Sequence, residues 1–277
     1  GVLGVSTEAL AKGLKLKIEG LKHVYWHELF ENFRPVTSRL ATKTRQRVMD
    51  KLQASMSIDF TPDNVHALCA WLIKNCNQYF DDQLIELVER MTKKANVINY
   101  KSNVKTFAEE GWRYGRTPEI ERYKLDHRII LECWKALDYG YFGDQSPTLD
   151  STVADLLNDL MTVANNLGFE TRHEAPAGRR AWEAGQKVLF HFTDRKTGQR
   201  AVAFEAKAHK KGTLHLKVNQ RLMCRLNVEF GRLKGWVRNA QEAADEMDIS
   251  VTQAQAAFHS NLRLGNDALL ALAAPLP

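Results

Sequence analysis

The sequence predicts an α+β protein that is mainly α: a helical body, then a small antiparallel three-stranded sheet packed on a helix, and then a helical tail. Apolar residues recur at helical spacing through most of the first 168 residues, and from Val188 the period falls to two, which is typical of half-buried strands. The 277 residues are 44% hydrophobic and 26% charged, which excludes collagen-like, disordered and disulfide-scaffold chains. We expect three parts: a helical body over 1–168, a basic sheet and helix over 187–238, and an acidic helical tail over 239–277.

Local sequence signals mark where several helices of the helical body should begin and end. Residues 8–55 have helical spacing, and Phe60-Thr61-Pro62-Asp63 predicts the start of a further helix, because Thr caps and Pro suits the first turn. Asp81 or Asp82 is expected to cap the next helix. Residues 120–137 are expected to be helical.

A last helix of the body is predicted from Thr152, in a capping-box pattern with Asp155, to a stop at Gly168. Residues 169–186 are interpreted as a connecting loop.

Three strands and one helix follow. The alternating sets predict the strands 188–192, 202–208 and 214–218, joined by loops with Gly198 and Gly212 in the left-handed conformation. Keeping the apolar sides together pairs Phe190 with Val202 and Ala206 with Leu216. Phe204 then faces the core, and Glu205 lies between Lys187 and Lys217 on the polar face.

The helix predicted over 220–237 should cover the apolar face of this sheet. Leu222, Leu226 and Phe230 share one arc of it, and a set of arginines lies on another arc.

The charge is concentrated in one segment. Residues 195–238 contain twelve Lys and Arg against Glu205 and Glu229, a balance of +10, whereas residues 239–277 carry −4 and the first 194 residues are neutral, which gives +6 in total. Such a density on a sheet and helix indicates contact with a phosphate backbone, although a solvated surface has the same composition. The residues predicted to bind nucleic acid are Lys207, Lys210, Lys211, Lys217, Arg221, Arg225 and Arg232.

Two other functions remain open. Asp194, followed by Glu205 and Lys207 on one strand, has the order of metal-dependent nucleases of the PD-(D/E)xK type, in which the acids bind a divalent cation and the lysine steadies the attacking water. A structural cross-strand ion pair of Glu205 explains the same residues. The other alternative is an assembly factor whose helical part binds a phage or host protein.

No cofactor or metal site is expected. The motifs GxGxxG, GxxxxGK[ST] and GxSxG do not occur, and the four cysteines have no paired spacing. Scattered thiols suit a reducing cytoplasm, and no apolar run approaches the roughly 18 residues of a membrane span.

Residues 240–258 faintly resemble a helix-turn-helix motif. However, the segment is acidic, and Asp248 occupies the position where the turn of that motif usually has a glycine, so a plain helical pair is favoured.

Several stretches, spread over about residues 20–235, resemble domain-of-unknown-function family 4942, which occurs in proteins of plasmids, prophages and other mobile elements. They are Tyr25-Trp26-His27-Glu28-Leu29, Phe60 to Val65, Tyr100-Lys101-Ser102-Asn103, Lys211 to Leu216, and Leu222 to Gly231.

The resemblance implies a cytoplasmic protein of a bacterial host and supplies no catalytic residues. Some members of the family carry the name of methyltransferases, but this sequence lacks the glycine-rich cofactor loop and the Asp/Asn-Pro-Pro-Tyr/Phe motif of that activity. We therefore expect a non-enzymatic protein that contacts DNA through its basic segment.

Overall fold

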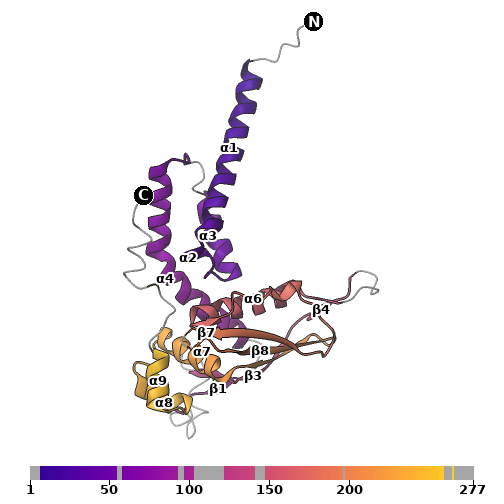
Figure 1. The fold of residues 1–277 in the computed structure, drawn as a ribbon, viewed down its shortest axis with the longest axis vertical. Helices are drawn as coiled ribbons and strands as arrows, with labels where there is room; N and C mark the ends of the chain where they lie inside the picture. The colour runs from indigo at the N-terminus through magenta and orange to yellow at the C-terminus, as the bar shows by residue number, and fades with distance from the viewer. Residues whose placement is uncertain are drawn as a thin grey trace, which may run out of the picture. The chain divides into compact units, whose positions relative to one another are not determined.

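The computed structural model describes residues 7–54, 58–92, 97–102, 122–140, 147–195, 197–258 and 264. The chain forms two compact units, one of residues 1–79 and 264–277 and the other of residues 80–263. Figure 1 shows the elements of both in sequence colours. Within the described residues, no helix combines the length and apolar character that a membrane span requires.

The first unit is helical but more interrupted than its sequence predicts. Its first three helices are α1 (Thr7–Asn32), α2 (Arg34–Thr37) and α3 (Thr42–Ala54), so the single helical stretch expected over 8–55 is broken twice. The first break comes at Phe33, because Pro35 in the first turn of α2 has no N–H to continue α1. Trp26 and Phe30, near the end of α1, are buried.

Helix α4 (Pro62–Thr92) begins at the predicted place. The Thr61 hydroxyl accepts a hydrogen bond from the Asn64 N–H (3.3 Å), which satisfies a free donor of the first turn. The prediction that a new helix starts at Asp81 or Asp82 is wrong, because α4 continues through both residues. No Gly or Pro interrupts this stretch, and the Asp81 side chain is buried rather than placed at a helix end.

The second unit is built on an antiparallel sheet of five strands in the order β3-β9-β8-β7-β6, not the three that were predicted. The three central strands are the predicted ones: β7 (Val188–Asp194), β8 (Arg200–His209) and β9 (Thr213–Val218). The outer strands are β3 (Arg128–Glu132) and β6 (Phe169–Glu170). Helix α6 (Ser151–Asn166) lies along this sheet (Figure 1).

The helix predicted over 120–137 is wrong for the described residues 122–137; residues 120 and 121 lie outside the described part. That stretch forms β2 (Tyr123–Leu125), β3 and the first residue of β4 (Leu137–Asp138). In β3 the buried Ile129 and Leu131 alternate with exposed neighbours, which is a period of two.

The register of the sheet confirms one predicted hairpin and corrects the other. Ala206 pairs with Leu216 as expected, and Phe204 is buried while Glu205 lies on the polar face. Phe190, however, pairs with Phe204 and not with Val202. This slip of two residues keeps the side chains from Phe204 to Ala208 on their predicted faces. A bulge between Phe190 and His191 then shifts the register again, so that Val202, predicted on the apolar side, lies opposite His191, and Ala203, predicted on the polar side, is buried.

Short elements complete the second unit. The helix predicted from Thr152 is α6, but its cap is Asp150, whose carboxylate accepts from the Thr152 N–H (2.9 Å). Gly198 and Gly212 have the predicted positive φ (69° and 78°).

The loop predicted over residues 169–186 also contains two short elements, β6 and a 3-10 turn, η1 (Ala177–Arg179). Two-stranded sheets are formed by β1 (Val97–Asn99) with β2 and by β4 with β5 (Thr148–Leu149).

The C-terminal helices share one core with α7 (Gln220–Leu233). Helix α7 buries Leu222, Leu226 and Phe230 as predicted and begins at Asn219, whose side chain accepts from two N–H groups of the first turn. Helices α8 (Ala240–Met247) and α9 (Val251–Phe258) form the predicted helical pair, joined through Asp248 in the left-handed conformation (φ 56°). A cluster of buried side chains from Tyr100, α7, α8 and α9 joins these elements.

Candidate nucleic-acid interface

The side chains that alternate outward from the sheet form a charged surface, here called the polar sheet face. The register places Glu205 opposite Lys217, Lys207 opposite His215, and Arg128 opposite Lys217 on its other side. These side chains are exposed or half-buried. The polar sheet face consists of Arg128, Lys187, Glu205, Lys207, His215 and Lys217.

Glu205 lies between two lysines, as the sequence predicts. Its carboxylate is 3.1 Å from the Lys187 amine, and Lys217 is its direct neighbour on β9. Within the described residues, Lys207 and Lys217 have no carboxylate within ion-pair distance. Four cations, Arg128, Lys187, Lys207 and Lys217, outnumber Glu205 and the outward-facing Glu132 of β3, so the face keeps a net positive charge.

A pair of histidines adjoins these lysines. The rings of His209 and His215 lie 4.4 Å apart between centroids, and Lys207 is directly opposite His215. Burial first, and then the positive groups His209 and Lys207, lower the pKa of His215 below its usual 6.5. His215 is therefore mostly neutral at pH 7, and a phosphate placed beside it would favour its charged form.

The turn between β8 and β9 presents Lys210 and Lys211 to solvent. The Lys210 amine lies 5.5 Å from the centre of the Tyr139 ring, and no described acid pairs with either lysine. Gly212 then closes the turn with its N–H donating to the His209 carbonyl (3.1 Å). These two residues extend the positive surface beyond the end of the sheet.

The three predicted arginines of α7 have other surroundings. Arg221 donates to the Asp194 carboxylate (2.9 Å), and Arg232 donates twice to Glu229 (2.5 and 3.1 Å), whose side chain is fully buried. The hydrogen bonds and charge of Glu229 raise the pKa of Arg232. Arg225 is half-buried, and burial lowers the pKa of its guanidinium. Arg232 therefore compensates a charge in the interior of the unit, whereas the Arg221 side chain remains mostly exposed while it pairs with Asp194.

The candidate nuclease residues do not converge in the structure. Glu205 pairs with Leu189 on β7, and Asp194 lies five residues further along that strand, about 17 Å at the rise of a β-strand. Asp194 instead holds its own turn, accepting from the Thr197 N–H (3.2 Å), and pairs with Arg221. In the part of the chain that the structure describes, no three His, Cys, Asp or Glu residues gather as metal ligands would.

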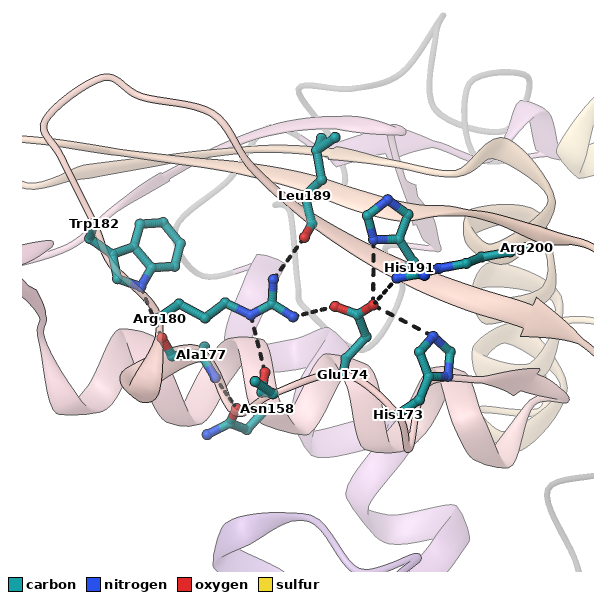
Figure 2. Close-up of polar contacts among 10 residues, drawn as sticks. Asn158, His173, Glu174, Ala177, Arg180, Trp182, Leu189, His191 and Arg200 are labelled. Carbon is teal, nitrogen blue, oxygen red and sulfur yellow. Dashed lines mark hydrogen bonds and ion pairs between the residues drawn. The ribbon is translucent and has the colours of Figure 1, made fainter.

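A further polar cluster surrounds the buried carboxylate of Glu174, in the segment that the sequence predicts only as a loop (Figure 2). Arg180 donates to one of its oxygens; the other is 3.3 Å from the Arg200 guanidinium, 3.4 Å from His191 Nδ1 and 3.5 Å from His173 Nε2. Burial raises the pKa of Glu174, but the hydrogen bond and charge of Arg180 and the charge of His191 outweigh it, so the pKa lies below its usual 4.5.

Arg180 connects this cluster to the edge of the sheet. It donates to the Leu189 carbonyl (2.9 Å), and its guanidinium lies 4.2 Å from the centre of the Phe190 ring. Strand β6 pairs with β7 only at Thr193 and Asp194, so the Leu189 carbonyl faces an open edge that Arg180 covers. The sequence signal for this cluster is weak: Glu174 is one of three glutamates in the loop, and it lies close to His173, Arg179 and Arg180.

Comparison with known proteins identifies the family but no activity. A search of curated proteins gives no match, and neither does a search of solved structures. The family model of the domain of unknown function DUF4942 matches residues 18–236, which include both helical and sheet elements. This chain therefore belongs to the DUF4942 family.

Proposed function

We propose that this protein binds nucleic acid without catalysing a reaction, through the polar sheet face and the lysine-bearing β8–β9 turn. The supporting observation is the unbalanced charge of Lys207, Lys210, Lys211 and Lys217, which lack ion-pair partners in the described part of the chain, beside arginines that have them. When an unpaired cation of a protein binds a phosphate of the nucleic acid, counterions are released and the affinity increases. A cation that is already paired to an acid contributes less to this affinity.

The test compares two triple variants with equal loss of charge. K207Q/K211Q/K217Q removes three cations from the proposed interface, and K12Q/K15Q/K17Q removes three exposed lysines from α1. Fluorescence anisotropy with a labelled DNA strand should show weaker binding only for the first variant, with a salt slope smaller by about 2. Equal loss in both variants, or binding that does not weaken as salt rises, would refute the interface.

Within this proposal, the protein serves a mobile genetic element in a bacterial cytoplasm, and its nucleic acid is DNA. Membership of the DUF4942 family supports the setting through the resemblance described above. A survey of the genes that lie next to DUF4942 genes in bacterial genomes tests this setting. Plasmid or prophage genes should recur among these neighbours. A set dominated by chromosomal housekeeping genes would contradict it.

Assembly through α1 is the second candidate function. Leu14, Ile18, Leu21 and Tyr25 are each about half exposed, and their 4-3-4 spacing is that of a coiled-coil seam. A second copy of the same helix, which carries the same apolar residues, is the proposed partner. Light scattering should then show a dimer that I18K/L21K converts to a monomer; a monomeric wild-type protein would rule it out.

A further inference from the structure

Trp134, in the segment after β3, is fully exposed, which is rare for the largest apolar side chain. Trp26 and Trp182, by contrast, are buried. An exposed aromatic ring beside positive charge is typical of surfaces that stack on a ligand.

The backbone holds Trp134 beside the β8–β9 turn. The Cys133 N–H donates to the Gly212 carbonyl (2.7 Å), so the two segments are joined by a hydrogen bond. A Cβ added at Gly212 would lie 2.5 Å from the Cys133 carbonyl and 3.2 Å from that of Trp134, and its φ of +78° also favours glycine. This close packing fixes the backbone of Trp134 next to the turn that contains Lys210 and Lys211.

We infer that Trp134 stacks on an unpaired nucleobase while Lys210 and Lys211 contact the adjoining phosphates, so that single-stranded nucleic acid is the preferred ligand class. The inference rests on the proposed function and deepens it. A free ring face needs a base whose own face is free, which single strands offer along their length and duplexes only at their ends. Half-exposed Ile130, opposite His215, adds apolar surface to the polar sheet face.

Binding of a thymidine oligonucleotide of about 12 nucleotides, a length within the range of known single-strand sites, tests this inference. W134A should weaken its binding roughly tenfold and leave duplex binding unchanged, whereas W134F should keep most of the affinity because phenylalanine still stacks. The matched control V251A removes another exposed apolar side chain, on α9, and should bind like the wild type. The oligonucleotide should also quench the tryptophan fluorescence of the wild type more than that of W134F.

The outcomes separate the two proposals. If the wild type binds neither the oligonucleotide nor a duplex, the proposed function fails and the inference fails with it. If the wild type binds but W134A binds equally well, only the inference fails. A blue shift of Trp134 fluorescence with phosphatidylserine vesicles, and no quenching by the oligonucleotide, would overturn it in favour of a lipid surface. Thermal melts followed by circular dichroism establish that each variant is folded.

Discussion

Helix α7 and the polar sheet face carry the same kind of charge but use it differently. Arg221 and Arg232 of α7 donate to Asp194 and Glu229, the latter within the interior of the unit. Lys207 and Lys217 of the sheet have no such partner among the described residues. A cation that compensates a buried carboxylate is needed for folding, whereas an unpaired surface cation remains available to a ligand. Formal charge along a sequence therefore overstates the surface available to a polyanion.

The largest expected effect is on the stability of α7. Arg232→Ala leaves the Glu229 carboxylate buried without its donor, and the free energy of unfolding should fall by roughly 3 kcal/mol. Urea denaturation measures it. Arg238→Ala is the control, because its pair with Glu242 is exposed, and its midpoint should stay near that of the wild type. If both variants are equally stable, the contrast between paired and free cations is lost.

The packing of α7 predicts a second loss of stability. A Cβ at Gly231 would clash with the Tyr100 hydroxyl and lie 3.0 Å from Val237, so Gly231→Ala should overpack this core by about 1–3 kcal/mol. Gly20→Ala is the matched control: nothing lies within 4 Å of the added Cβ in α1, and it should be neutral or stabilising. Thermal unfolding of both variants is the measurement. A stable Gly231→Ala protein would indicate that Tyr100 does not pack against α7.

Binding should separate the two regions in the opposite sense. Lys217→Gln should weaken binding of a DNA strand a few-fold with little change in melting temperature. Arg221→Gln, which loses a pair with Asp194, should change binding less. Anisotropy titrations at two salt concentrations compare them. A larger loss of binding from Arg221→Gln than from Lys217→Gln, in folded protein, would assign the interface to α7 instead.

The smallest effect concerns pH. The pKa of His215 is below 6.5, so at neutral pH it is uncharged, and a bound phosphate would raise that pKa. Binding then takes up a proton, so affinity should increase as the pH falls through the raised pKa of the bound state, and should not change with pH above it. His209 and Lys207 oppose this protonation. Affinity measured from pH 5.5 to 8 for wild type and His215→Gln checks it; an identical slope in both would place the ligand elsewhere.

Local patterns predicted much of this fold. The alternation around Phe204 and Glu205 identified the three central strands and their faces, and the Thr61-Pro62 signal identified the start of α4. The β7–β8 register was missed because a slip of two residues leaves the faces unchanged, so alternation cannot detect it. Strand β3 was missed because it is short and pairs with β9 far along the chain.

The candidate site was predictable only in part. A count of Lys and Arg along the sequence identified the basic segment. The partner of Arg221 and the exposure of Trp134, however, depend on contacts between distant segments of the chain. The pair of Glu229 and Arg232, three residues apart on one helix, is the exception that spacing alone indicates. Burial of Glu229, which makes that pair structural, is a property of the folded unit.

The Glu174 cluster has a consequence for solubility. An unprotected strand edge is a template on which another chain can add a strand. Arg180 blocks the edge of β7 at Leu189, and Glu174 is one of the groups that hold Arg180 there. Because the pKa of Glu174 is lowered, its ionised form stabilises the fold at neutral pH, and this contribution is lost as the pH falls below 4.5. Acid would then weaken this cover of the edge, and chain-to-chain strand pairing, measured as turbidity, should increase below pH 4.5 relative to pH 7.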